Sequence, residues 1–386
     1  MRDMSLRKNI VANYTSQVYI TLISIVMVPM YISYMGAEAY GLVGFYWMLE
    51  SWFVLLDMGL TSTIQRETAR YFAGIGEGSA YRRLLRILEA VFLAIALCGC
   101  AAIFFLSRPI SMNWLHASHL PLAEVDRSVK FIAFIIAFRW MGSLYRGTIA
   151  GSERQVWLGI FSSVIATLRA GGILPVLVYV GVSPTIFFAF QCAIALIELF
   201  GMMAYAYRFL PAMPAGKGGV QDVVLLKPLL GFSLAVALSS TVTTAVSELD
   251  KLLLSNILTL KSYGYFSVAI LVANGVTRLS LPVTSALMPR LSRLEAEGDD
   301  PGFIRVYRQS TQLVTVFAGS AAITLAFCAE PLLLAWTGDR ELAVSTAPVL
   351  QLYSLGNGIM AVECFQYYLQ YAKGKMRLHL IWTAVT

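Results

Sequence analysis

Long apolar runs separated by short polar connections form the dominant pattern of the chain. An α-helix needs about 20 apolar residues to cross a hydrocarbon layer about 30 Å thick. Since backbone groups in lipid must bond within their own segment, runs of this length predict helices. An eleventh run begins near Arg377 and continues to Thr386. The ten complete predicted spans cover residues 10–33, 40–62, 87–107, 128–150, 156–180, 184–208, 230–256, 263–288, 311–335 and 344–371.

An internal repeat relates the first half of this pattern to the second. The dipeptide Tyr-Gly follows both the first and the seventh span, and the offset between the two copies also aligns later positions. With six spans in each copy, both halves have the same orientation, an arrangement that transporters use to bind substrate between parallel repeats. The alternative is a chance alignment of two apolar sequences. The matched positions are Tyr40-Gly41 with Tyr263-Gly264, Thr61-Ser62 with Thr284-Ser285, and Arg70 with Arg293.

We therefore predict an all-α polytopic membrane protein built from two parallel six-helix repeats. The expected domains are an N-terminal six-helix lobe over residues 1–210, a cytoplasmic linker over 211–229 and a C-terminal lobe over 230–386. The linker contains the sequence PAMPAGKGG, and Pro and Gly in this density are typical of a flexible connection. The C-terminal lobe holds fewer than six spans, so we expect the second repeat to be truncated.

Composition supports this interpretation, because 58% of the residues are hydrophobic and only 13% are charged, whereas soluble domains are roughly a quarter charged. Most Lys and Arg residues lie at the N-terminus and in the even-numbered connections, to which we also assign Arg146. Because cytoplasmic connections are enriched in Lys and Arg, the N-terminus is predicted to be cytoplasmic. The net charge of +7 thus reflects topology and contact with membrane lipids, and nucleic acid is not an expected partner.

Polar residues form a stripe along one face of the first span, and the seventh span repeats it at the same offset. Their spacings of three and four residues place them on one side of a helix. The stripe indicates a water-filled cavity that contacts sugars, because lipid does not tolerate such a face. Hydrogen bonding between packed helices is the alternative. The stripe consists of Asn13, Gln17, Thr21 and Ser24 in the first span and Ser240, Thr244 and Ser247 in the seventh.

Basic residues inside the spans predict an anion-binding lumen. A charge at the centre of a span costs about 2.5–3.5 kcal/mol on insertion scales, so it must face a partner or a wet cavity. Arginine suits a pyrophosphate because its fork makes bidentate contacts and keeps its proton. Structural ion pairs, such as Arg139 or Arg169 with Glu198, are the competing interpretation. The candidate ligands of the anion are Arg139, Arg169, Lys251 and Arg278.

Acidic residues inside the spans predict a second, weaker possibility. Glu50, Asp57 and Glu198 are candidates for carrying protons or sodium ions that couple to transport. Glu50 and Asp57 are seven residues apart, as are Arg139 and Arg146, so each pair shares a helix face.

Enzyme chemistry has no support in the sequence. There is no Walker motif, no GxSxG and no HExxH. His116 and His119 form an HxxH in a predicted outer connection, where solvated residues are the ordinary interpretation. The five cysteines lie inside apolar runs without zinc-ligand spacing. We therefore predict neither an enzyme, nor a metal site, nor a cofactor.

Several motifs resemble the O-antigen and exopolysaccharide flippases (the Wzx type). These flippases belong to the multidrug/oligosaccharidyl-lipid/polysaccharide exporter superfamily. The second half of the chain resembles the family's seventh and eighth spans. The motifs are Pro29-Met30-Tyr31-Ile32, Gly36, Tyr40-Gly41-Leu42, Leu56-Asp57-Met58-Gly59-Leu60, Glu67-Thr68-Ala69-Arg70, Asp250-Lys251, Tyr263-Gly264 and Pro289-Arg290-Leu291.

The resemblance implies a MATE-like fold of two six-helix lobes in the bacterial cytoplasmic (inner) membrane. It implies a cargo of oligosaccharide linked to undecaprenyl pyrophosphate, which is flipped to the outer face by alternating access for polysaccharide biosynthesis. The implied partners are the lipid-linked oligosaccharide, membrane lipids, and the polysaccharide polymerase with its chain-length machinery.

Three other functions are open. A cation-coupled antiporter of drugs or organic cations, from the same superfamily, would have a cavity dominated by acids, whereas the central charges here lean basic. A membrane polymerase or ligase of polysaccharide assembly would carry catalytic residues in a large outer loop, and the longest outer connection here spans only about residues 108–127. A structural membrane subunit would not need two matched polar stripes.

Overall fold

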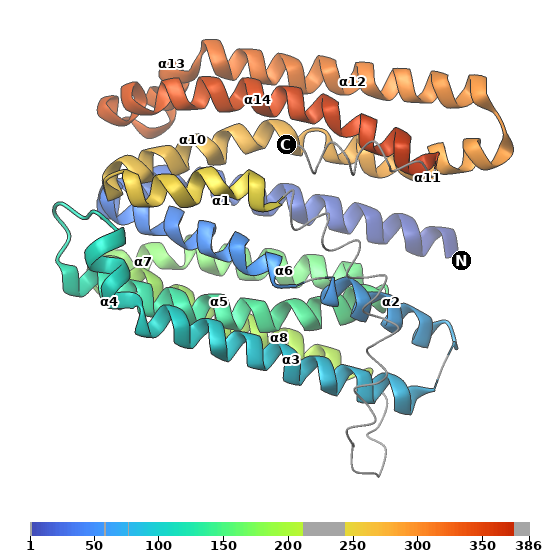
Figure 1. Cartoon of the computed structure of the whole chain (residues 1–386), viewed down its shortest axis with the longest axis horizontal. Coiled ribbons are helices and arrows are strands. Elements are labelled where there is room, and N and C mark those ends of the chain that lie inside the picture. The colour runs from blue at the N-terminus through green and yellow to red at the C-terminus, as the bar shows by residue number, and fades with distance from the viewer. Residues whose placement is uncertain (1, 58, 76, 211–243, 374–386) are drawn as a thin grey trace. The chain divides into compact units, whose positions relative to one another are not determined.

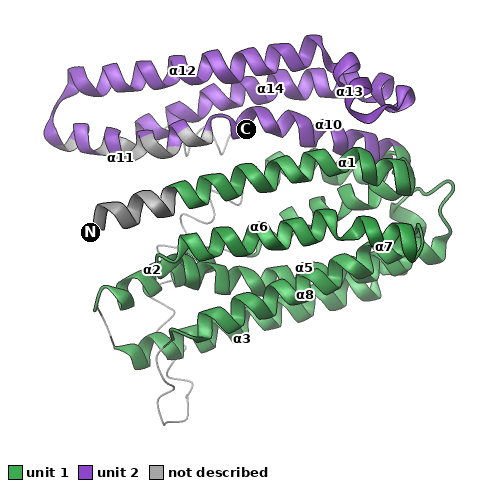
Figure 2. Ribbon diagram, turned by 180° about the vertical axis from the view of Figure 1, so that it is seen from behind, with its two compact units in different colours: residues 1–261 green, residues 262–386 purple. Residues whose placement is uncertain are grey.

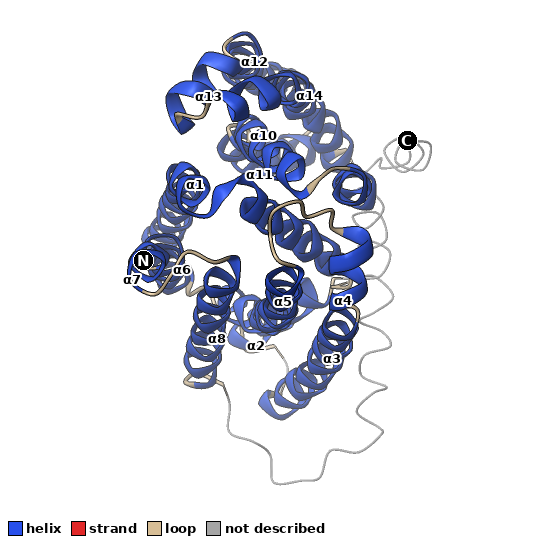
Figure 3. Ribbon diagram, turned by 90° about the vertical axis from the view of Figure 1, so that its left-hand side faces the viewer, coloured by secondary structure: helices blue, strands red, loops and turns tan. Residues whose placement is uncertain are grey.

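The computed structural model describes residues 2–57, 59–75, 77–210 and 244–373. Within these ranges the regular secondary structure is helical, and the one bridge between extended residues joins His116 to Thr259. Figure 3 shows helices joined by short loops throughout the described parts. The predicted all-α class is therefore confirmed.

Two compact units divide the chain, residues 1–261 and residues 262–386 (Figure 2). The first unit contains α1 (Arg2–Leu55), α2 (Leu60–Phe72), α3 (Gly78–Phe105), α4 (Ser107–Pro109), the π-helix η1 (Ile110–Trp114), α5 (Leu122–Gly151), α6 (Gln155–Gly171), α7 (Ile173–Tyr179), α8 (Pro184–Tyr207) and a helix over residues 244–257. The second contains most of α10 (Leu260–Arg278), followed by α11 (Leu281–Glu297), α12 (Asp300–Phe327), α13 (Ala329–Thr337) and α14 (Arg340–Ala372). The predicted linker at 211–229 lies outside the described residues.

The first two predicted spans both belong to α1, whose chain folds back on itself at Gly36 (Figure 1). Gly36 has φ 83° and ψ 160°, a conformation that only glycine adopts without strain. The second span ends earlier than predicted. Gly59 has φ 75° and interrupts the helix before α2 begins, and the Asp57 carboxylate accepts hydrogen bonds from the Thr61 N–H (3.2 Å) and hydroxyl (2.6 Å).

Membrane-crossing segments are abundant in the described residues. Six helices there are long and apolar enough to cross a membrane. The most enclosed of them is α5, in which 61% of the most apolar 18-residue window is buried. Since α5 packs against α2, α3 and α8, it forms the centre of the first unit.

The connection between α3 and α5 is held in place mainly through its backbone. The Glu38 carboxylate, just past the turn of α1, accepts the backbone N–H groups of Ser118 and His119. The Trp114 indole N–H donates to the Ser255 hydroxyl (2.9 Å), and the Leu260 N–H donates to the His116 carbonyl (3.0 Å). This connection therefore joins the α1 turn to residues 255–260, at the end of the first unit.

Small residues allow α5 to approach α2 closely. A Cβ atom added at Gly151 would lie 2.3 Å from the backbone oxygen of Gln65. We expect Gly151→Ala to destabilise the first unit by about 1–3 kcal/mol, because the helices must move apart. Thermal unfolding in detergent measures this loss. Gly142, on the same helix, has no atom within 4 Å of an added Cβ, so Gly142→Ala is the matched control and should be neutral or slightly stabilising. Equal unfolding temperatures for the two variants would contradict the prediction.

Candidate functional site

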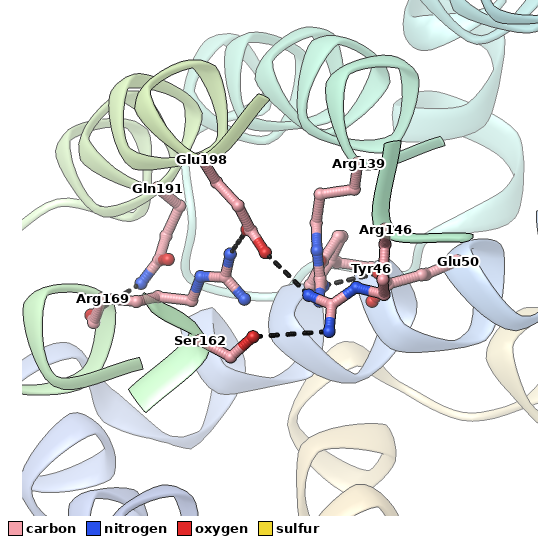
Figure 4. A network of polar contacts seen from close by, with 8 residues as sticks. All are labelled: Tyr46, Glu50, Arg139, Arg146, Ser162, Arg169, Gln191 and Glu198. Atoms are coloured by element: carbon pink, nitrogen blue, oxygen red, sulfur yellow. Dashed lines mark hydrogen bonds and ion pairs between the residues drawn. The ribbon is translucent and has the colours of Figure 1, made fainter. Parts of the chain in front are cut away.

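A polar cavity of about 540 Å³ lies inside the first unit, among α1, α2, α5, α6 and α8. Apolar side chains such as Phe53, Trp140 and Ile165 form much of its wall. Charged groups from four of these helices project into it (Figure 4). The polar residues of its lining are Gln17, Glu50, Asp57, Thr61, Ser62, Arg139, Ser143, Arg146, Ser162, Arg169 and Glu198.

One ion pair in the cavity joins α5 to α1. The Arg139 guanidinium lies 2.5 Å from the Glu50 carboxylate and also donates a hydrogen bond to the Tyr46 hydroxyl. The Arg139 and Glu50 side chains are 29% and 27% exposed, so both charges reach the open part of the cavity. Because Tyr46 is buried, its hydrogen bond with Arg139 holds the Arg139–Glu50 pair against the cavity wall.

A second charge cluster places two arginines on one carboxylate. Glu198 on α8 accepts a hydrogen bond from Arg169 on α6 through one oxygen, and from Arg146 on α5 at 3.3 Å through the other. Arg146 also donates to the Ser162 hydroxyl (3.4 Å), and Gln191 donates to the backbone carbonyl of Arg169 (3.2 Å). Figure 4 shows the two guanidinium groups approaching Glu198 from opposite sides. The carboxylate is the most buried of the three groups, with 10% of its side chain exposed.

The charges of the cavity are arranged unevenly. Three arginines and two glutamates form the ion-paired network, which carries one excess positive charge, although the whole lining has as many acids as arginines. The third acid of the lining, Asp57, is bonded to Thr61 instead. Each guanidinium carries five N–H donors and no acceptor, so the network has more donors than its two carboxylates can satisfy. The cavity can therefore accept an anion that offers several oxygens.

The structure places two of the four predicted anion ligands in one cavity, and one of the expected ion pairs has a different partner. Arg169 does pair with Glu198, as the ion-pair interpretation expected, whereas Arg139 pairs with Glu50. The acidic candidates Glu50 and Glu198 are therefore the counter-ions of arginines. Lys251 lies elsewhere in the first unit, where its ammonium group is 2.5 Å from Glu248, one helical turn away.

The polar stripe is only partly at the cavity. Gln17 is in the lining, whereas Ser24 donates to the carbonyl of Ile20 within its own helix (2.7 Å). Asn13 and Thr21 lie on the same helix outside the lining, and Thr244 and Ser247 lie in the helix over residues 244–257. Ser240 is outside the described residues. Arg278, which ends α10, is exposed and belongs to the second unit.

Sequence reasoning missed Arg146 as a cavity residue. We assigned it to a cytoplasmic connection because it lies near the end of the predicted span 128–150, but its side chain on α5 lines the cavity. A signal was available, since Arg146 follows Arg139 by seven residues and so lies on the same helix face. Among the described residues, no cluster of three or more His, Cys, Asp or Glu side chains is placed to hold a metal ion.

Residues 6–295 match the model of a family described as "Polysaccharide biosynthesis protein". A solved structure of the lipid II flippase MurJ, in an inward closed conformation, superposes with a TM-score of 0.73 at 14% identity, over 97% of this chain and 78% of that chain. An inward-facing multidrug resistance MATE family transporter of the MOP superfamily gives 0.70 at 12% identity, over 94% of this chain and 83% of that one. Comparison with curated protein sequences gives no significant match.

A third similar structure is a MOP superfamily transporter from Pyrococcus furiosus, with a TM-score of 0.56 at 12% identity, over 98% of this chain and 84% of that chain. Its description states that the reverse polarity of its binding pocket suggests a different function. At such low identities the likeness establishes the fold alone. The predicted MATE-like fold is confirmed.

Proposed function

The chain belongs to the polysaccharide biosynthesis protein family, and from this premise we propose that it flips a lipid-linked oligosaccharide across the bacterial cytoplasmic membrane. Membership of the family and the folds shared with the MurJ and MATE structures support a membrane flippase or transporter. The proposed cargo is an oligosaccharide on undecaprenyl pyrophosphate, used for O-antigen or a related surface polysaccharide. On this proposal the N-terminus is cytoplasmic, the lobes at 1–210 and 230–386 alternate in access, and the polymerase and chain-length machinery receive the product.

The observation that carries the proposal is the convergence of Arg146 and Arg169 on Glu198. A pyrophosphate has more charge and more oxygens than one carboxylate, so it can replace Glu198 on both arginines and accept bidentate hydrogen bonds. Glu198 offsets part of the charge of the two arginines and holds them in position when the cargo is absent. This preorganisation favours binding of the head group. If the long arginine side chains had to become ordered on binding, the affinity for the head group would be lower.

The uncharged lining suits the sugars. Gln17 and the hydroxyl groups of Thr61, Ser62 and Ser143 offer donors and acceptors beside the arginines. Phe53 and Trp140 add apolar and aromatic surface in the same cavity. Arg278 remains a candidate second contact for the head group, and Asn13, Thr21, Ser24, Thr244, Ser247, Ser240 and Lys251 remain candidates for the rest of the transport path. No catalytic residue is required.

A cation-coupled antiporter is the second candidate, because Asp57 in the lining bonds to Thr61 and a carboxylate free of an arginine partner suits a proton or cation. The three arginines in the same cavity oppose an organic cation by like-charge repulsion. For this reason the anionic cargo is favoured. Glu50 and Glu198, as arginine counter-ions, are weaker coupling candidates than Asp57.

Complementation of a bacterium that lacks its polysaccharide flippase tests the proposal. The parent chain is expected to restore surface polysaccharide, and Arg169→Lys is expected to lower it severalfold at matched expression, because lysine keeps the charge but loses the bidentate fork. Arg127→Ala is the matched control, since Arg127 is exposed and donates to the Ala123 carbonyl of its own helix. Restored resistance to cationic drugs without restored polysaccharide would overturn the proposal in favour of the antiporter.

A further inference from the structure

A second group of arginines lies at one end of the first unit, where α3 begins and α8 ends. Arg82 and Arg86 on α3 both lie over the ring of Tyr207 on α8, with their guanidinium carbons 4.6 Å and 5.8 Å from the ring centroid. Four residues separate the two arginines, so they point from the same face of α3. Neither belongs to the lining of the polar cavity.

A buried carboxylate holds Tyr207 in position below the arginines. Glu89 accepts hydrogen bonds from the hydroxyl groups of Tyr207 (2.6 Å) and Tyr145 (3.2 Å) through one oxygen. Its other oxygen pairs with Arg86 at 3.1 Å. Both oxygens of the Glu89 carboxylate thus have partners, and this acid pairs with Arg86 rather than with Arg82.

Arg82 is the unusual member of the group. Only 6% of the residue is exposed, and its Nε and Nη1 atoms have no hydrogen-bond partner in the part of the chain that the structure describes. A guanidinium cannot shed its charge by losing a proton. The face of Tyr207 attracts the charge but offers these N–H groups no acceptor. Buried charged donors without acceptors are strongly unfavourable, so the geometry calls for an acceptor beyond the residues that the structure describes.

We infer that this corner of α3 and α8 binds the phosphate head group of an anionic membrane lipid, with Arg82 and Arg86 as its ligands. Arg86 has 46% of its side chain exposed, so it can contact the head group at the surface beside Arg82. A phosphodiester supplies both the missing negative charge and several acceptor oxygens. The inference rests on the protein being in a membrane, and it is independent of the proposed cargo.

The surroundings match a membrane–water interface. The ring of Trp157 stacks on Tyr205 with centroids 3.7 Å apart, and the Arg154 guanidinium lies 4.5 Å from the centroid of Phe209. Trp and Tyr gather at the head-group level of membrane proteins, and arginines beside a membrane surface attract anionic lipids. A lipid phosphate is therefore available at the depth where Arg82 lacks an acceptor.

Native mass spectrometry of the purified full-length chain in neutral detergent tests the inference. We expect phosphatidylglycerol to be retained at about tenfold lower concentration than phosphatidylcholine, and Arg82→Gln to remove about that tenfold preference, the usual effect of one hydrogen bond to a charged group. Arg83→Gln is the matched control, because Arg83 is the next residue and is exposed. It should retain the lipid as the parent does.

Three outcomes would overturn the inference. Equal retention of the two lipids by the parent would show that no anionic site exists. Full retention of phosphatidylglycerol by Arg82→Gln would show that Arg82 is not a ligand, and if that variant does not fold, full retention by the exposed-site variant Arg86→Gln counts in the same way. Displacement of the lipid by an equal concentration of inorganic phosphate would show that a free anion is the ligand.

Discussion

Glu198→Ala is expected to destabilise the first unit by about 3–5 kcal/mol, the usual loss when one partner of a buried ion pair is removed. Glu198 is the common counter-ion of Arg146 and Arg169, and only 10% of its side chain is exposed. Its removal leaves two guanidinium groups facing each other in the cavity without a carboxylate between them. Thermal unfolding of the purified protein in detergent measures the loss as a lower midpoint.

Glu67→Ala is the control for this prediction. Glu67 also receives two arginines, Arg66 and Arg70, but their side chains are 44% and 52% exposed, and exposed pairs contribute about 0–1 kcal/mol. The double variant Glu198→Leu with Arg169→Met should recover much of the stability, because the two substitutions together remove one negative and one positive charge. A loss no larger for Glu198→Ala than for Glu67→Ala would show that Glu198 is not needed as a counter-ion.

Hydropathy predicted the all-α class, but it did not predict the helix breaks or the partners of the charged side chains. Apolar runs longer than a soluble helix needs predicted the spans, and the Tyr-Gly repeat predicted two equivalent sites, Tyr40 and Tyr263, which are both buried (0% and 2% exposed). Helix breaks were harder to predict. Gly36 and Gly59 act through their backbone conformation, and a glycine within an apolar run gives no hydropathy signal to mark the break.

Not all partners of the buried charges could be predicted from the sequence. Arg139 and Arg169 were both expected as partners of Glu198, whereas the packing of α5 against α1 places Arg139 on Glu50. Arg146 was assigned to a connection because a hydropathy boundary cannot distinguish a charge that faces lipid head groups from one that turns into a cavity. Arg82 lies in a polar connection of the hydropathy pattern, and its burial depends on its packing over the ring of Tyr207.

Arg146→Ala is expected to lower translocation of the lipid-linked oligosaccharide by about 10- to 100-fold, the value of one or two hydrogen bonds to a charged group. Stability should change by less than about 1 kcal/mol, because 42% of the Arg146 side chain is exposed and Arg169 still pairs with Glu198. Flipping of a fluorescent lipid-linked oligosaccharide in proteoliposomes measures the first effect, and thermal unfolding measures the second.

This separation of effects makes Arg146 the sharpest test of an anion-binding cavity. If the cavity arginines serve only the fold, Arg146→Ala should leave flipping as intact as stability, and Arg127→Ala, at an exposed site on the same helix, should behave identically. If they bind the head group, Arg146→Lys should recover part of the flipping, because it restores the charge without the fork. A loss of flipping that only follows a loss of folded protein would show that Arg146 is a structural residue.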